Sequence, residues 1–121
     1  MATMLVVDDE RDITQVLADF LTVRGHDVSE AQSGAQALAL AHQRNFDVIF
    51  LDIAMPGMDG NETLRQLKME FPRTIVIMIS GISDEDTALK SLDLGAFDFI
   101  RKPFELSHLD SVIALGLAAR S

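Results

Sequence analysis

The sequence contains no cysteine, tryptophan or tyrosine, and only three prolines among its 121 residues. Without cysteine, disulfide bonds and thiolate metal ligands are excluded, and the redox state of the compartment is not indicated. Basic side chains are scarce. The sequence has ten lysines and arginines and 19 acidic residues, which gives a net charge of −9. This charge argues against direct binding to nucleic acid or to an anionic membrane. No apolar run approaches the length of a membrane span, and the first residues lack the layout of a signal peptide.

What the sequence does contain is typical of one globular domain. Apolar residues make up 48% of the chain, and no segment is rich enough in proline, glycine or serine to act as a linker. We therefore expect a single domain over residues 1–121, with a sizeable core and no output domain. No internal repeat is present.

Four short apolar runs, rich in β-branched residues, each stop at polar side chains. Such runs are typical of strands that are buried on both faces of a parallel sheet. The runs cover residues 4–7, 48–51, 75–79 and 97–100. The polar residues that follow them are Asp8 and Asp9, then Asp52, then Ser80, then Arg101 and Lys102. Because parallel strands share their carboxyl edge, where ligands bind in open α/β sheets, we expect these side chains to converge.

Helical patterns lie between the strands and predict an α/β sandwich built from βαβ units. A shorter strand, Val28 to Ala31, has polar neighbours and is expected at a sheet edge. Ser33 and Gln36 form a capping-box pattern before an alanine-rich helix. The predicted helices lie between Asp9 and Gly25, from Ala35 to His42, from Asn61 to Glu70, from Ser83 to Gly95, and from Glu105 to Ala119.

The acids at the predicted edge indicate a cation site. Like charges a few ångströms apart repel one another, and Mg²⁺ is a hard cation that accepts carboxylate, water and phosphate oxygens together. Helix capping alone would explain Asp8 and Asp9, but the addition of Asp52 from another strand favours a metal site. Taken singly, Ser80 is explained as a turn residue and Lys102 as a solvated lysine.

The same set of side chains suits phosphoryl transfer. A carboxylate such as Asp52 can attack phosphorus and form an aspartyl phosphate, a reaction that needs positioning and charge neutralisation. Mg²⁺ and Lys102 would neutralise the charge, and Ser80 would donate a hydrogen bond to a phosphoryl oxygen. The Lys102–Pro103 bond could be cis and turn the lysine over the site, although a trans proline opening a helix is the default. The three histidines have no ligand spacing and are expected at the surface: His26, His42 and His108.

Motifs along the whole chain resemble the receiver domain of two-component response regulators, the CheY-like family. They are Asp8-Asp9-Glu10, the segment DIAMPGMDG from Asp52 to Gly60, Ser80-Gly81, LGAFDF over residues 94–99, and Lys102-Pro103-Phe104. The resemblance implies a flavodoxin-like, doubly wound sheet of five parallel strands in the order 2-1-3-4-5, flanked by five helices. It also implies a cytoplasmic signalling protein that is not an enzyme, beyond slow autophosphatase activity.

The resemblance assigns a role to each site residue. Asp52 would be the phosphoacceptor, supplied by a histidine kinase or a histidine phosphotransfer protein. Mg²⁺ would be bound by Asp9, Asp52 and the backbone carbonyl of Ala54, with Asp8 acting through water. Ser80 and Lys102 would grip the phosphoryl group. The switch residues would be Phe99, which turns inward on phosphorylation, and Pro103.

Several expectations concern lifetime and partners. Ala54 offers no side chain to orient a hydrolytic water and Ile82 could shield the site, so we expect a long-lived phosphorylated form. Serine at position 80 could hold the switch less firmly than threonine does. The fourth and fifth helices with the fifth strand would meet an output domain or a second copy, through residues such as Thr87, Lys90, Ser91 and Asp93. Ile13 would contribute to kinase docking.

Two other functions compete with this one. A haloacid-dehalogenase-type phosphatase also forms an aspartyl phosphate, but it needs a second acid where this sequence has Ala54, and it needs a cap domain. A pseudo-receiver would bind partners without phosphorylation, although such proteins usually lose an acid or the lysine, and here none is missing.

Overall fold

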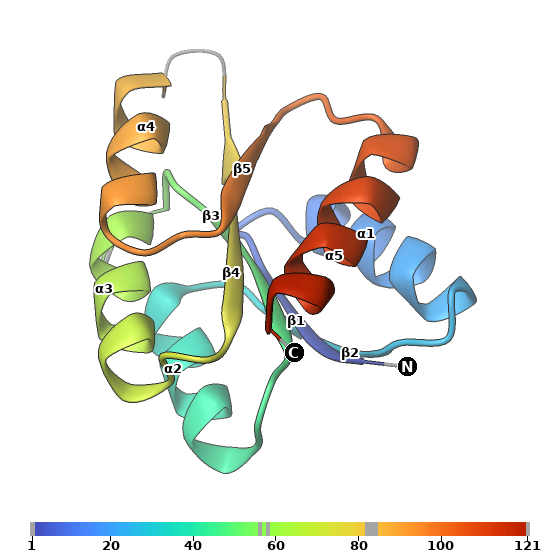
Figure 1. Cartoon of the computed structure of the whole chain (residues 1–121), viewed down its shortest axis with the longest axis horizontal. Helices are drawn as coiled ribbons and strands as arrows, with labels where there is room; N and C mark the ends of the chain where they lie inside the picture. Colours follow the sequence, from blue (N-terminus) through green and yellow to red (C-terminus); the bar gives the residue numbers. More distant parts are fainter. Residues whose placement is uncertain (1, 56, 58, 82–84, 121) are drawn as a thin grey trace.

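A computed structural model describes residues 2–55, 57, 59–81 and 85–120. They form one parallel sheet of five strands in the order β2-β1-β3-β4-β5, with helices on both faces (Figure 1). The flavodoxin-like fold expected from the sequence is therefore confirmed. The elements are β1 Thr3–Val7, α1 Arg11–Val23, β2 Asp27–Ala31, α2 Gly34–Gln43, β3 Val48–Asp52, α3 Gly60–Glu70, β4 Ile75–Ser80, α4 Glu85–Asp93, β5 Asp98–Arg101 and α5 Leu106–Arg120.

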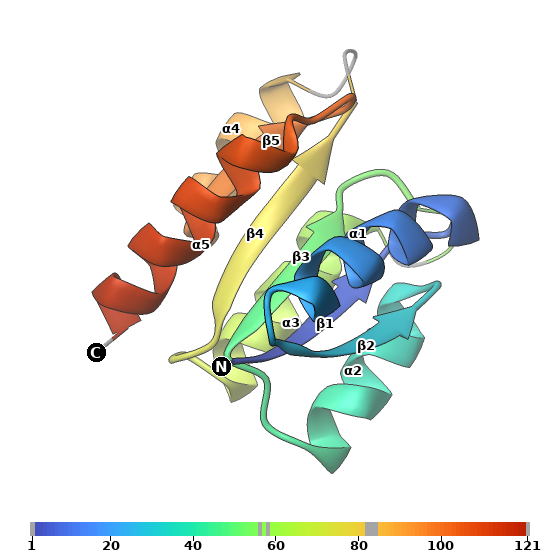
Figure 2. The same cartoon turned by 90° about the vertical axis from the view of Figure 1, so that its right-hand side faces the viewer.

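The three central strands are the apolar runs of the sequence. Both faces of β1, β3 and β4 are covered, so nearly every residue in them is buried. The polar strand β2 pairs only with β1 and forms an edge, as its composition predicted. Because all pairings are parallel, the arrowheads of the strands point toward the same side of the molecule (Figure 2).

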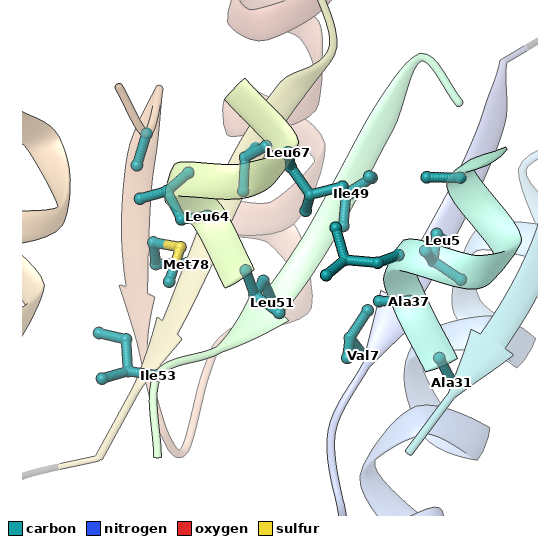
Figure 3. Close-up of a cluster of buried hydrophobic side chains, with 14 of the residues drawn as sticks. Leu5, Val7, Ala31, Ala37, Ile49, Leu51, Ile53, Leu64, Leu67 and Met78 are labelled. Carbon is teal, nitrogen blue, oxygen red and sulfur yellow. The ribbon is translucent and has the colours of Figure 1, made fainter. Parts of the chain in front are cut away.

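Two apolar clusters hold the helices on the sheet. Side chains of α1 and α5 join one cluster, around Phe50 and Ile79. Side chains of α2, α3 and α4 join the other, where Leu64 and Leu67 of α3 and Ala37 of α2 lie over the strands (Figure 3). Burial of apolar surface on both faces is the main force that stabilises this layered arrangement.

The helix starts match the sequence signals with one exception. Ser33 caps α2, since its hydroxyl accepts a hydrogen bond from the Gln36 N–H at 3.1 Å. The Gln36 side chain accepts instead from the Gln32 N–H at 2.8 Å, so the reciprocal half of the predicted capping box is wrong. Asp59 caps α3 in the same way, through the Glu62 N–H at 2.8 Å. Each such cap contributes about 1 kcal/mol to helix stability.

Several boundaries differ from the expected ones by a residue. The last strand is Asp98–Arg101 rather than 97–100. Ser80 belongs to β4, because it pairs with Arg101 of β5 across the sheet. The Lys102–Pro103 bond is cis, so the trans default is wrong, and α5 begins only at Leu106. The predicted start of the fourth helix at Ser83 lies outside the described residues, as does Ile82.

One expectation about surface residues is wrong, two others concern residues that are half-buried, and the docking role of Ile13 stays a prediction. Ser91 is fully buried, because its position on α4 faces the sheet, so it does not contribute to an exposed face. His26 is half-buried, and its Nδ1 accepts a hydrogen bond from the Ala2 N–H at 3.1 Å. Ile13 is half-buried against the core, whereas Val16 of the same helix is 52% exposed. His42 and His108 are exposed, as predicted.

Within the described residues, no helix is both long enough and apolar enough to cross a membrane.

Candidate functional site

The predicted functional residues lie along the carboxyl edge of the sheet. Asp8 directly follows β1, while Asp52 and Ser80 are the last residues of β3 and β4. Lys102 follows β5, and its backbone N–H donates to the Ser80 carbonyl at 2.7 Å. The fold therefore brings together residues that are up to 94 positions apart in the sequence, since Asp8 and Lys102 meet in an ion pair.

The ammonium of Lys102 is shared by several carboxylates. Its Nζ lies 2.9 Å from Asp8 Oδ2, 3.4 Å from Asp52 Oδ2 and 3.9 Å from Glu10 Oε1. Asp8 is fully buried and Asp52 is 3% exposed, whereas Glu10 is exposed. Two buried carboxylates thus depend on one cation, so the cluster carries an excess of negative charge.

The carboxyl group of Asp52 is strongly perturbed by this environment. Burial and the neighbouring charge of Asp8 raise its pKa to about 7, although the Lys102 ammonium and the Ala54 N–H oppose the shift. Burial alone would lower the pKa of Lys102, but the contacts with Asp8 and Asp52 outweigh burial and raise it. Lys102 therefore stays charged at neutral pH, while Asp52 needs further positive charge to ionise fully.

The acids at the end of β1 are suited to a divalent cation. Oxygens of Asp8, Asp9 and Glu10 lie within 4.8 Å of one another, and Asp9 and Glu10 are exposed to an incoming ion. The buried Oδ2 of Asp8 accepts no hydrogen bond of normal geometry from the described part of the chain, although Lys102 Nζ is close to it. Hard oxygen donors with unsatisfied capacity fit Mg²⁺.

The acidic cluster shares Asp8 and Asp9 with the predicted ligand set, and the ligand roles stay predictions. Glu10 also belongs to the cluster, and the predicted set did not include it although it directly follows Asp9. Asp52 does not belong to it, and its nearest charged partner is Lys102. The Ala54 N–H donates to Asp52 Oδ1 at 3.4 Å, and the role of the Ala54 carbonyl as a ligand stays a prediction.

Ser80 is 1% exposed, and its hydroxyl is directed across the sheet. Ser80 Oγ donates to the Ile100 carbonyl at 3.5 Å, a long and therefore weak hydrogen bond. The backbone of Ser80 is in place beside Lys102, but its hydroxyl would have to change partner to reach a phosphoryl group. That change stays a prediction.

Phe99 and Pro103 border a common hollow at the end of β5. Phe99 is half-buried and packs against the core cluster on the α4 side of the sheet. Both residues line a cavity of about 410 Å³, together with Phe104 and His108. Phe99 therefore has core on one side and open space on the other, and its role as a switch stays a prediction.

Gly60 is a structural part of the site that sequence reasoning did not single out. Its N–H donates to the Ile53 carbonyl at 2.8 Å. A Cβ at this position would lie 2.4 Å from the carbonyl oxygen of Asp52 and 2.6 Å from the Cα of Ile53. Only glycine allows the start of α3 to approach the backbone of Asp52 so closely.

The comparisons with known proteins agree with this geometry. The family model described as "Response regulator receiver domain" matches residues 4–114. The chain is 34% identical over 118 residues to the regulatory protein AtoC of Escherichia coli, covering 98% of this chain and 26% of that protein. It is 41% identical over 108 residues to the nitrogen assimilation regulatory protein NtrX of Azorhizobium caulinodans, covering 88% of this chain and 24% of that one.

Solved structures show the same likeness. The receiver domain of NtrX from Brucella abortus superimposes with a TM-score of 0.91 at 38% identity, covering 95% of this chain and 98% of that domain. The chain thus spans about a quarter of the length of the curated relatives that it matches, and nearly all of an isolated receiver domain. On its sequence, its sheet order and the placement of its carboxylates, the chain belongs to the family of response regulator receiver domains.

Proposed function

We propose that the domain is a phosphorylation-controlled signalling switch whose acceptor is Asp52. The single observation that carries this proposal is the position of Asp52: a buried carboxylate at a strand end, 3.4 Å from the ammonium of Lys102 and beside the acids that follow β1. A structural carboxylate would not need this concentration of charge. Family membership supports the proposal.

The donor is a phosphohistidine of a kinase or a phosphotransfer protein. An oxygen of Asp52 attacks phosphorus, the phosphorus–nitrogen bond breaks, and the leaving imidazole takes up a proton. Lys102 holds its ammonium beside the attacking carboxylate and compensates charge on the phosphoryl oxygens. Asp9, Asp52 and the backbone carbonyl of Ala54 would hold Mg²⁺, with Asp8 acting through water and Glu10 near them. The ion would supply the remaining charge neutralisation. Ser80 then donates its hydroxyl to a phosphoryl oxygen.

The phosphorylated form is long-lived for a receiver, and the domain is an acceptor rather than an enzyme with turnover. Ala54 is exposed two residues after Asp52, and its methyl group offers no hydrogen bond to orient a hydrolytic water. We expect a lifetime of minutes or longer, measured by loss of the phosphoryl group with Mg²⁺ at neutral pH and room temperature. A lifetime of seconds would contradict this prediction.

The output partner meets the surface formed by α4, β5 and α5. Leu89 and Leu92 of α4 and Leu115 of α5 are 52%, 38% and 63% exposed, so an apolar contact is available there. Thr87 and Lys90, predicted for this surface, are exposed and also border a cavity with residues of α3. The partner is an output domain, an effector protein or a second copy of the chain, as the greater length of the relatives suggests.

The test is incubation with acetyl phosphate and Mg²⁺, followed by intact-mass measurement. Wild type should gain one phosphoryl group, and Asp52→Asn should gain none. Chelation of Mg²⁺ should abolish the gain in wild type. Wild type that gains nothing under any of these conditions would instead be a pseudo-receiver, and turnover of phosphate esters would indicate a phosphatase.

A further inference from the structure

A hydrogen bond joins the first turns of α3 and α4. Asn61 lies in the first turn of α3, and its Nδ2 donates to the carbonyl oxygen of Thr87, in the first turn of α4, at 3.3 Å. The two helices cover the same face of the sheet (Figure 1). The Oδ1 of Asn61 is buried and accepts no hydrogen bond from the described residues. The hydrogen bond to Thr87 therefore offsets part of the free-energy cost of burying the amide.

The space beside this contact is not filled by side chains. A cavity of about 310 Å³ lies between the two helices, bordered by Glu62 and Arg65 of α3 and by Lys90 and Leu94 at the α4 end. Because close packing is lacking here, the hydrogen bond carries more of the attachment between these two helices than it would in a tightly packed interface.

The described side chains of α4 make few other strong attachments. Those that are buried are small, Ala88 and Ser91, while Leu89 and Leu92 are exposed. The helix has nine residues, too few to be stable without contacts to the rest of the fold. A segment of this kind opens locally at a low free energy, so one hydrogen bond has a measurable effect on it.

The other end of the link reaches the acceptor residue. Asn61 follows Gly60, whose N–H is bonded to Ile53 and whose Cα packs directly on the Asp52 backbone. The close approach leaves no room for the backbone of Asp52 and Ile53 to shift toward Gly60 without displacing it. A displacement of the backbone at Asp52 therefore moves the start of α3, and with it the amide that holds Thr87.

We propose that Asn61 is a positioning residue that couples the backbone of Asp52 and Ile53 to the first turn of α4. This inference rests on the proposed function: on phosphorylation of Asp52 this backbone shifts, the bond to Thr87 weakens, and α4 is released toward its partner-binding state. The coupling runs through α3, separately from Ser80 and Phe99 on β4 and β5.

The first arm of the test uses the unphosphorylated chain and amide hydrogen exchange. Asn61→Asp keeps the size of the side chain and favours the start of α3, but replaces the donor by an oxygen that repels the Thr87 carbonyl. Exchange over residues 85–94 should become about two- to tenfold faster, with protection of β1 and β3 unchanged. Asn61→Ala should act in the same direction. Gln15→Ala is the matched control, because it removes an amide that bonds within α1, to Asp19, and should leave α4 unchanged.

The second arm compares the same proteins after treatment with acetyl phosphate and Mg²⁺. Phosphorylation should accelerate exchange in α4 of wild type, and it should do so less in Asn61→Asp, because the link is already broken. Unchanged α4 exchange in both unphosphorylated variants would overturn the coupling, and so would an equal increase on phosphorylation in wild type and Asn61→Asp. Failure of wild type to gain mass is a separate readout that overturns the proposed function itself.

Discussion

At the scale of single residues, the centre of the site is a charge imbalance. The carboxylates of Asp8 and Asp52 are buried and both face the single ammonium of Lys102. An arrangement of this kind costs folding free energy, since the second carboxylate lacks a full partner in a region from which water is largely excluded. In the proposed function, the same imbalance would attract a divalent cation and would favour a reaction that brings positive charge to the site. Stability and the proposed function are therefore opposed at these positions.

The charge imbalance predicts that Asp8→Asn stabilises the metal-free protein. The amide removes one of two buried negative charges while keeping the shape of the side chain, so the free energy of unfolding should rise by about 1–2 kcal/mol. Urea unfolding in the presence of EDTA measures this change. Asp9→Asn is the control, because Asp9 is exposed and its charge is solvated, so its effect in EDTA should be smaller. With millimolar Mg²⁺ the advantage of Asp8→Asn should shrink or reverse, and a variant that is less stable than wild type in EDTA would contradict the explanation.

At the scale of elements, the start of α3 fixes the geometry of the acceptor. Asp59 caps the helix and Gly60 lets its first turn rest on the backbone of Asp52 and Ile53. A rigid strand end on one side and a capped helix start on the other thus hold the backbone of Asp52, the proposed acceptor. Positioning of this kind is what an acceptor contributes to phosphoryl transfer.

We expect Gly60→Ala to impair both stability and phosphorylation. The added methyl group would lie 2.4 Å from backbone, which cannot yield as a flexible side chain does, so the free energy of unfolding should fall by about 1–3 kcal/mol. Gly116→Ala is a matched control: its Cβ would lie 3.0 Å from a methyl group of Ile75, far from the acceptor in the fold. Gly60→Ala should lose stability in urea unfolding, and only Gly60→Ala should slow the mass gain with acetyl phosphate. Equal phosphorylation rates in the two variants would show that Gly60 serves stability alone.

The elements also show what sequence can and cannot predict. The runs that became β1, β3 and β4 were recognisable because burial on both faces demands continuous apolar residues, and the polar residues after them marked the site. The burial of Ser91 could not be foreseen, because it depends on how α4 is rotated on the sheet. The bond from Asn61 to Thr87 and the overlap of Gly60 with Asp52 are contacts between distant segments. They follow from packing, which a local pattern does not encode.

At the scale of the whole molecule, charges are paired differently at the two ends of the parallel strands. These ends are the carboxyl edge, which carries the site, and the amino edge opposite it. At the edge opposite the site, Asp47 accepts a hydrogen bond from the Thr3 N–H at 2.8 Å and also pairs with Arg120. Arg44 and Asp27 form another pair, with Nη2 and Oδ2 2.7 Å apart. At the site edge, the carboxylates outnumber the one lysine that they contact. At this edge the fold thus keeps unmatched negative charge, where a cation and a phosphoryl group are proposed to bind.

Groups at these two edges change the folding stability with pH in opposite directions. Burial and the nearby terminal charge lower the pKa of His26 from its ordinary value of 6.5, and its neutral Nδ1 accepts the Ala2 N–H. The unfolded chain therefore takes up this proton first, and the stability due to His26 is lost as pH falls below about 6.5. Asp52 has the opposite sign: its pKa of about 7 exceeds its ordinary value of 3.8, so its unfavourable contribution grows as pH rises from about 3.8 and is complete above about 7.

The contribution of His26 is consequently measured best where Asp52 cannot titrate. In the Asp52→Asn background with EDTA, the free energy of unfolding should decrease from pH 7.5 to pH 5.5. Adding His26→Gln should flatten this decrease, because the glutamine oxygen can accept the Ala2 N–H without taking up a proton. Urea unfolding at several pH values gives both slopes. If the two slopes coincide, the bond between Ala2 and His26 does not control the pH response, and other groups at the amino edge of the sheet must account for it.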